Sequence, residues 1–311
     1  MNNSEPKTII ITGPTAVGKS NTALILAEQL GLEIISADSL QVYKQLNIGT
    51  SKPSEAELAR VLHHCINIVE PDEEFNANLF SKITKKLQKE NQKKNKHTLL
   101  CGGTGLFIEA FLHDFECSIP SDEKVREEIT KLGEERGLEY LYGILQEKDS
   151  KYAKKVTAGD RQKIVRALEV EQITGKPFSS FHRDREKEPV DPSVHYIVLS
   201  QERKKLYDRI NARVDQMMDE GFYEEVVSLL KKGYGRELKA LKSIGYNELI
   251  AYHFGEITRE EAVKKIKQNS RRLAKRQFTW HRRHKEAIVI DIDEQNPVEE
   301  ILKLLKEGTK P

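Results

Sequence analysis

The clearest chemical signal in the chain is the stretch Gly13–Ser20, whose sequence GPTAVGKS matches the phosphate-binding pattern GxxxxGK followed by Ser or Thr. Glycines allow successive backbone N–H groups to face one anion, and the N-terminus of a following helix adds partial positive charge. Lys19 supplies a charge for the terminal phosphates, and the Ser20 hydroxyl is a ligand for Mg2+. The pattern therefore predicts a polyphosphate site formed by Gly13, Pro14, Thr15, Ala16, Val17, Gly18, Lys19 and Ser20.

This pattern does not identify the reaction, because it occurs in ATP-binding and other nucleotide-binding proteins of several kinds. A kinase or NTPase, a transferase that uses another diphosphate, and a nucleotide-driven switch all remain open. The next carboxylate along the chain, Asp38, directly follows the apolar segment 33–37. We expect it at the carboxyl edge of a parallel sheet, beside the phosphate loop. There it could bind Mg2+, act as a base or cap the following turn, and its position alone favours none of these.

Short apolar runs rich in β-branched residues predict the strands that position these groups. They cover residues 7–11, 32–37, 96–101, 195–200 and 287–291, and helical segments alternate with them. Such alternation predicts an α/β fold with a P-loop NTPase-like parallel sheet core. The stretch 118–191 contains helical patterns at 122–136 and 160–173 and no convincing strand. We therefore expect an all-helical insertion domain at 118–191 within a core formed by residues 1–117 and 192–311.

The overall charge is nearly balanced, with 51 Lys or Arg residues against 49 Asp or Glu residues. The distribution is more informative, since residues 262–285 contain ten Lys or Arg residues and no Asp or Glu. This asymmetry indicates a surface that binds the phosphates of a nucleic-acid backbone.

No apolar run reaches the roughly 20 residues that cross a membrane, and the polar start lacks the features of a signal peptide. We expect a cytoplasmic protein with no membrane partner, and its three cysteines, with no CxxC pair, indicate reduced thiols.

Several further blocks, in the same order along the chain, resemble the tRNA dimethylallyltransferases, also called isopentenyl-diphosphate:tRNA transferases. Besides the phosphate loop, they are ADSLQVYKQLNIGTSKP at 37–53, His63-His64, GGTGLF at 102–107, RALEV at 166–170, GYNE at 245–248 and KRQFTWHRR at 275–283. The resemblance implies that dimethylallyl diphosphate donates its prenyl group to N6 of the adenosine at position 37 of tRNA. The products would be N6-(dimethylallyl)adenosine and diphosphate, and Mg2+ would be required. We expect the enzyme to act as a monomer.

The resemblance also implies roles for single residues. Asp38 matches the base that takes the proton from N6, and Lys19 and Arg213 match groups that act on the diphosphate. From the residues alone, a solvated helix face is the more common role for an arginine such as Arg213. The matches to tRNA-binding positions are Asp38, Ser39, Leu40, Gln41 and Thr104 around the target base, Lys242, Gly245 and Tyr246 in a tRNA-facing loop, Arg126, Gln162, Lys163 and Arg166 at the anticodon stem-loop, and Lys275, Arg276 and Arg282 on the basic segment.

Two of these matches carry alternatives. Tyr246 either stacks on an unstacked base or packs inside the protein. The family commonly has Gln-Arg where this chain has Gln162-Lys163, and a lysine supplies charge without the two-pronged guanidinium. Three other functions compete with the tRNA transferase: a small-molecule kinase, a transferase that prenylates free AMP, ADP or ATP, and a non-catalytic RNA-binding protein or nucleotide switch.

Overall fold

The computed structural model describes residues 6–113, 119, 121–181 and 191–307. The chain divides into two compact units, one formed by Met1–Leu112 with Val190–Pro311 and the other by His113–Pro189. The expected domain boundaries, 117/118 and 191/192, lie a few residues away from these divisions, and residues 117 and 118 fall outside the described residues. Among the described helices, none combines the length and the apolar composition needed to cross a membrane.

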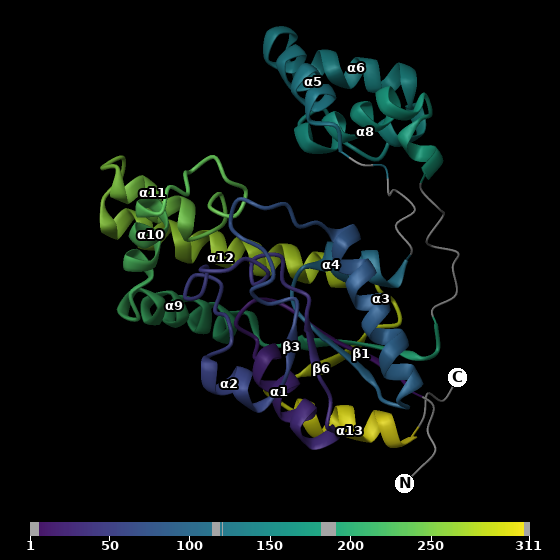
Figure 1. The fold of residues 1–311 in the computed structure, drawn as a ribbon, viewed down its shortest axis with the longest axis vertical. Helices are drawn as coiled ribbons and strands as arrows, with labels where there is room; N and C mark the ends of the chain where they lie inside the picture. Colours follow the sequence, from purple (N-terminus) through teal and green to yellow (C-terminus); the bar gives the residue numbers. More distant parts are fainter. Residues whose placement is uncertain (1–5, 114–118, 120, 182–190, 308–311) are drawn as a thin grey trace. The chain divides into compact units, whose positions relative to one another are not determined.

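A parallel sheet forms the centre of the larger unit (Figure 1). Its strands are β1 (Thr8–Thr12), β2 (Ile34–Ser36), β3 (His63–His64), β4 (Thr98–Cys101), β5 (Val194–Ser200) and β6 (Ile288–Asp291). Their order in the sheet is β3-β2-β4-β1-β5-β6, and every pair is parallel. The prediction of a P-loop NTPase-like parallel sheet is therefore confirmed. The five predicted strands differ from the observed ones only at their ends, and the two-residue strand β3 completes the sheet.

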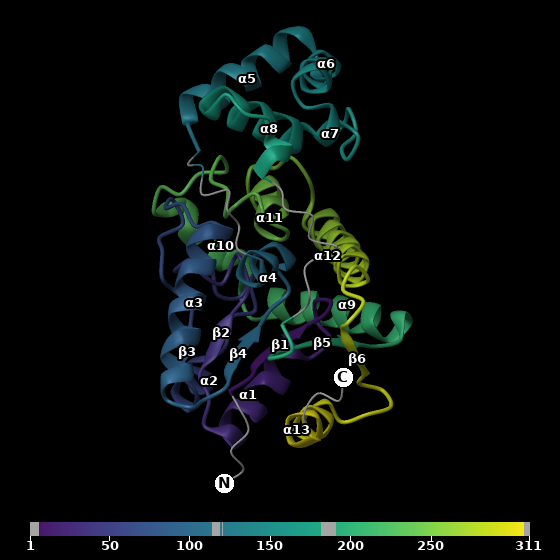
Figure 2. The same ribbon diagram turned by 90° about the vertical axis from the view of Figure 1, so that its right-hand side faces the viewer.

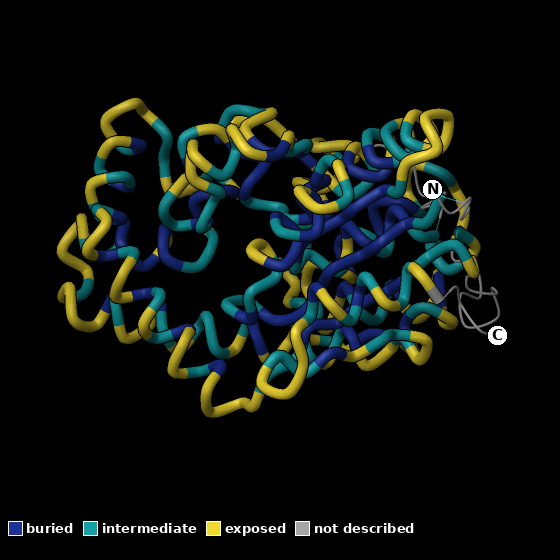
Figure 3. The backbone as a smooth tube through the Cα atoms, turned by 90° about the horizontal axis from the view of Figure 1, so that it is seen from below, coloured by how far each residue is buried: buried dark blue, intermediate teal, exposed yellow. Residues whose placement is uncertain are grey.

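Alternate residues of the strands face two separate cores, as the pleat of a strand requires. Ile9 and Ile11 pack in one core with α1 (Lys19–Leu30) and α13 (Pro297–Glu307), whereas Ile10 packs in the other. The second core contains residues of α3 (Ala77–Lys93), α4 (Gly105–Leu112), α10 (Phe222–Lys231) and α11 (Tyr246–His253), while α9 (Arg203–Asp219) and α12 (Arg259–His281) contribute to both. Figure 2 shows α1 and α13 on one side of the sheet and α3 on the other. The central strands β1 and β4 are buried over their whole length (Figure 3).

The smaller unit is helical where the structure describes it. It contains α5 (Glu123–Arg136), α6 (Leu138–Lys148), α7 (Ser150–Ala153), α8 (Arg161–Thr174) and a 3-10 turn at Phe178–Phe181. Ile129, Leu141, Leu145 and Ile164 belong to its own buried core. The helices predicted at 122–136 and 160–173 correspond to α5 and α8, each beginning one residue later than expected.

Candidate active site

The phosphate loop lies between the end of β1 and the start of α1, as its sequence predicts. Its turn depends on glycine, because Gly13 and Gly18 have φ values of 140° and 103°. A Cβ atom at Gly13 would also meet the backbone of Leu199. The Lys19 ammonium folds back over the loop and donates to the Pro14 carbonyl at 2.8 Å. The loop therefore holds a cation and the N-terminus of a helix around one small space.

Burial lowers the pKa of Lys19 to about 8. The neighbouring Asp38 carboxylate opposes this shift, and the Arg213 guanidinium adds to it. An ammonium that is poorly solvated and lies beside another cation is stabilised when an anion arrives. The electrostatics of the loop therefore favour binding of a phosphate group.

The order of the central strands brings three loops to one place. β4 lies between β2 and β1, so the carboxyl ends of all three strands meet at one edge of the sheet. Gly102 N–H donates to the Ile11 carbonyl at 3.1 Å, and Thr104 N–H donates to the Ala37 carbonyl at 3.0 Å. A Cβ atom at Gly102 would collide with the backbone of Ala37, so glycine is required for this close approach. The turn after β4 thus joins the phosphate loop to the segment that carries Asp38.

Asp38 uses one carboxylate oxygen to shape its own loop. Oδ1 accepts hydrogen bonds from the N–H groups of Leu40 at 2.9 Å and Gln41 at 3.4 Å. Oδ2 has no hydrogen-bond partner within the described residues, and Asp38 lines the same cavity as the phosphate loop. One oxygen therefore caps the turn, and the other is available to a ligand.

The side chains after Asp38 have two kinds of task. Thr104 Oγ1 accepts the N–H of Ser39 at 3.0 Å and donates to the Ser39 hydroxyl at 3.3 Å, so both hydroxyls lie at the cavity wall. Gln41 is buried, and its amide donates to the carbonyls of Thr50 and Ser51 and accepts the Ser36 hydroxyl at 2.9 Å. The Gln41 amide thus ties Ser36 of β2 to the loop at 46–51; because Gln41 also lines the cavity, its contact with the edge of a base stays a prediction.

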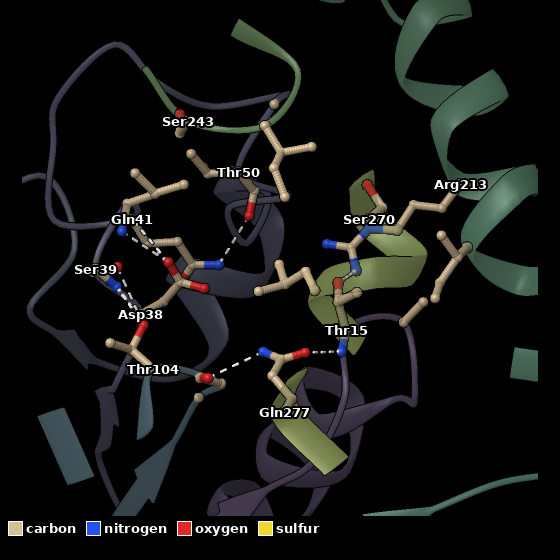
Figure 4. Close-up of a pocket in the computed structure, with 18 of the residues that line it drawn as sticks. Thr15, Asp38, Ser39, Gln41, Thr50, Thr104, Arg213, Ser243, Ser270 and Gln277 are labelled. Carbon is tan, nitrogen blue, oxygen red and sulfur yellow. Dashed lines mark hydrogen bonds between the residues drawn. The ribbon is translucent and has the colours of Figure 1, made fainter. Parts of the chain in front are cut away.

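Arg213 points from α9 into the cavity (Figure 4). Its Nε donates to the Ser51 hydroxyl at 2.7 Å, and its Nη1 donates to the Thr15 hydroxyl at 3.4 Å. Burial lowers the pKa of Arg213, and the nearby Asp38 opposes this effect. The alternative of a solvated helix face is therefore wrong for Arg213, which lies where an anion in the phosphate loop would meet it.

These groups surround one cavity of about 520 Å³. Its polar lining includes Lys19, Ser20, Asp38, Thr104 and Arg213. Its apolar lining consists of Leu40, Ile210, Val214, Met217, Phe222, Ile244, Ile266 and Leu273. Figure 4 shows Asp38, Ser39 and Thr104 on one side of this space, and Thr15 and Arg213 on the other. An anion site, an available carboxylate and an apolar wall together suit an allylic diphosphate.

Sequence reasoning missed the part that α12 plays in this cavity. The three-and-four spacing within 262–285 predicts a helix with Ser270, Leu273 and Gln277 on its packed seam, but all three line the cavity. Gln277 accepts the N–H of Thr15 at 2.8 Å and donates to the Gly103 carbonyl at 3.0 Å. The signal in the sequence was the presence of Ser270 and Gln277 in an otherwise apolar stripe, because a buried amide must find hydrogen-bond partners.

The predicted tRNA-facing loop is divided between surface and interior. Lys242 lines the cavity, and Gly245, with φ of 96°, precedes α11. Tyr246 is completely buried, packs edge-on against Phe222 and donates to the Glu225 carboxylate at 2.6 Å. The packing alternative for Tyr246 is confirmed, and stacking on a base is wrong, since no face of its ring is accessible.

The other residues predicted to bind tRNA belong to α12 of the larger unit and to the helical unit. Lys275, Arg276 and Arg282 at the end of α12 are exposed, and they form no ion pair with any described residue. In the helical unit, Arg126 and Arg166 both contact the fully buried Glu169 carboxylate at 3.0 Å. Gln162 is exposed, and Lys163 is 3.4 Å from Asp160. Arg126 and Arg166 therefore stabilise their own unit, whatever else they bind.

Comparisons with known proteins agree with this geometry. A family model described as IPP transferase matches residues 41–284. The chain is 40% identical to the tRNA dimethylallyltransferase of Natranaerobius thermophilus over 294 residues, which cover 94% of this chain and 88% of the relative. It is also 40% identical to the enzyme of that name from Bacillus licheniformis, over 94% of this chain and 93% of the relative.

Solved structures show the same likeness. The tRNA isopentenylpyrophosphate transferase of Bacillus halodurans superposes with a TM-score of 0.70 at 36% identity, covering 98% of this chain and 95% of that chain. The corresponding transferase of Staphylococcus epidermidis gives 0.70 at 33% identity, with 97% and 99% coverage. A eukaryotic dimethylallyltransferase that acts on tRNA shares the fold, with a TM-score of 0.80 at 22% identity over 97% of this chain and 79% of that chain. The chain therefore belongs to the IPP transferase family, the tRNA dimethylallyltransferases.

Proposed function

We propose that this protein transfers a dimethylallyl group from dimethylallyl diphosphate to N6 of the adenosine at position 37 of tRNA. The observation that carries the proposal is the shared cavity. Lys19, Arg213 and Asp38 line one space of about 520 Å³ that also has an apolar wall. The diphosphate would occupy the phosphate loop, the prenyl group would lie along the apolar side chains, and the adenine would enter beside Asp38.

The residues account for each part of the transfer. The N6 nitrogen attacks the allylic carbon, and the bond from that carbon to the diphosphate oxygen breaks with its electron pair. Asp38 Oδ2 takes the proton that N6 loses, a role that typically contributes about 10²–10⁴-fold. Lys19, Arg213 and the backbone N–H groups of Ala16–Ser20 stabilise the charge on the departing diphosphate. The adenine must first leave the stacked anticodon loop, at a cost of a few kcal/mol.

The donor groups in the cavity fit Mg2+. The Ser20 hydroxyl is exposed at the loop, and Asp38 Oδ2 is available in the same cavity, so both are hard oxygen donors. Within the described residues, no three His, Cys, Asp or Glu side chains cluster as a metal site. This suits an ion that is bound largely by phosphate oxygens and water, with Ser20 as its protein ligand. When bound, Mg2+ would supply positive charge to the diphosphate.

The tRNA would lie against the exposed cations of the chain. Lys275, Arg276 and Arg282 are unpaired within the described residues and suit contacts with RNA phosphates. Ser39, Leu40, Thr104 and Lys242 line the cavity that the base would enter. In the helical unit, Arg126, Gln162, Lys163 and Arg166 are proposed contacts for the anticodon stem-loop. We also propose that the enzyme acts as a monomer.

The decisive experiment is mass analysis of nucleosides from unmodified tRNA after incubation with enzyme, Mg2+ and dimethylallyl diphosphate. We expect N6-(dimethylallyl)adenosine in the anticodon loop. Free AMP, ADP and ATP are offered in parallel as acceptors, and ATP is also offered as a competitor of the donor. Prenylation of mononucleotides at the rate seen with tRNA, or strong ATP binding with no prenyl transfer, would reject the proposal.

A further inference from the structure

Gln277 lies on the cavity side of α12, and the two ends of its amide bind two other loops. Oε1 accepts the backbone N–H of Thr15 at 2.8 Å, and Nε2 donates to the backbone carbonyl of Gly103 at 3.0 Å (Figure 4). Only one orientation of the amide satisfies both contacts, because the N–H requires an acceptor and the carbonyl requires a donor. Both partners are backbone groups, so the contacts fix the course of the chain itself.

The two loops that Gln277 joins carry opposite halves of the site. Thr15 belongs to the phosphate loop, and its hydroxyl also accepts a hydrogen bond from Arg213 at 3.4 Å. Gly103 precedes Thr104, which binds the N–H of Ser39 directly after Asp38. A single side chain from α12 therefore adds a direct link between the phosphate loop, where the diphosphate would bind, and the turn that supports the Asp38 loop.

We propose that Gln277 is a positioning residue for prenyl transfer. It holds the phosphate loop and the turn after β4 at the separation that the reaction requires, and it fixes both to α12, whose other faces carry exposed cations. This inference rests on the proposed function, since it assigns a role within that reaction. A misplacement of about 1 Å between reacting groups can slow a reaction by about 100-fold.

The structure offers a second, independent way to break the same interaction. A Cβ atom at Gly103 would occupy the space of the Gln277 amide nitrogen. The backbone of Gly103 is not left-handed, so alanine is tolerated there apart from this collision. Gly103→Ala should therefore displace the Gln277 amide, just as Gln277→Met removes it.

The experiment compares Gln277→Met, Gly103→Ala and the double variant with the wild type. Gln268→Met is the matched control, because Gln268 lies on the same helix with its side chain exposed. Single-turnover rate, donor KM, tRNA affinity and affinity for inorganic diphosphate are measured for each. We expect each site variant to lower the rate about 10- to 100-fold and to weaken donor and diphosphate binding, with tRNA affinity unchanged. The double variant should be no worse than the more damaged single variant, since both changes remove the same interaction.

Several results would overturn the inference. Donor KM and rate at wild-type values in either single variant would show that the link between the two loops does not matter. Losses that multiply in the double variant would show that the two changes act separately. Equal loss of tRNA and diphosphate binding together with a lower Tm would indicate general destabilisation. If the proposed function itself were wrong, the wild type and Gln268→Met would also fail to prenylate tRNA, and the affinity for inorganic diphosphate would still test the role of Gln277.

Discussion

Replacing Asp38 with asparagine separates the two tasks of its carboxylate. Asparagine keeps an oxygen at the Oδ1 position, so the hydrogen bonds from Leu40 N–H at 2.9 Å and Gln41 N–H at 3.4 Å are retained. It replaces Oδ2, the oxygen that is available to a ligand, with an amide that cannot take a proton. We expect the loop to keep its shape and the rate to fall about 10²–10⁴-fold, which equals about 2.7–5.5 kcal/mol in the barrier.

Asp38→Ala provides the comparison, because alanine removes both tasks. The two hydrogen bonds that it removes are worth about 1 kcal/mol each, so this variant should also lose about 1–3 kcal/mol in its free energy of unfolding. Single-turnover assays with prebound tRNA measure the rate, and urea unfolding measures the stability. Filter binding then checks that tRNA affinity stays at the wild-type value in Asp38→Asn. Transfer by Asp38→Asn at a rate within about threefold of wild type would refute the assignment of Asp38 as the base.

Three further outcomes follow from the site. Because the pKa of Lys19 is about 8, the free enzyme loses this charge as the pH rises through 8. Diphosphate affinity, measured by calorimetry, should therefore fall above pH 8 more steeply in the wild type than in Lys19→Met, and equal pH profiles would contradict this. Changing Lys275 or Arg276 to glutamine should weaken tRNA binding. It should also reduce the slope of log K against log salt by about 1 for each phosphate that is no longer neutralised. An unchanged slope would show that these residues do not contact tRNA phosphates. Tyr246→Phe should lower the free energy of unfolding by about 1–2 kcal/mol, because it removes the hydrogen bond to Glu225, and it should leave tRNA affinity unchanged.

The fold was largely predictable because its signals are local. The β-branched run at 7–11, the glycine pattern at 13–18 and the three-and-four spacing within 262–285 each specify an element without reference to the rest of the chain. The meeting of the phosphate loop and Asp38 in one cavity was also predictable, since parallel strands bring the loops at their carboxyl ends together.

The partners of individual polar and aromatic side chains were not predictable, because local patterns do not specify which groups meet in the folded chain. Gln41 has the donor and the acceptor that a base edge needs, yet its amide is engaged by backbone carbonyls of Thr50 and Ser51. Tyr246 follows a glycine turn, a position compatible with either exposure or burial, and only the packing of Phe222 and Glu225 decides between them. Such tertiary interactions override what the local pattern suggests.

The order of the strands has a consequence for how the chain is made. β1 pairs on one side with β4 at 98–101 and on the other with β5 at 194–200, so the second partner leaves the ribosome almost one hundred residues after the first. Until then, the nascent sheet presents an unpaired apolar edge, the kind of edge on which incomplete chains aggregate. Early folding of the helical segment between β4 and β5 would bring these two strands closer together. It would thereby shorten the time for which one edge of β1 has no partner strand.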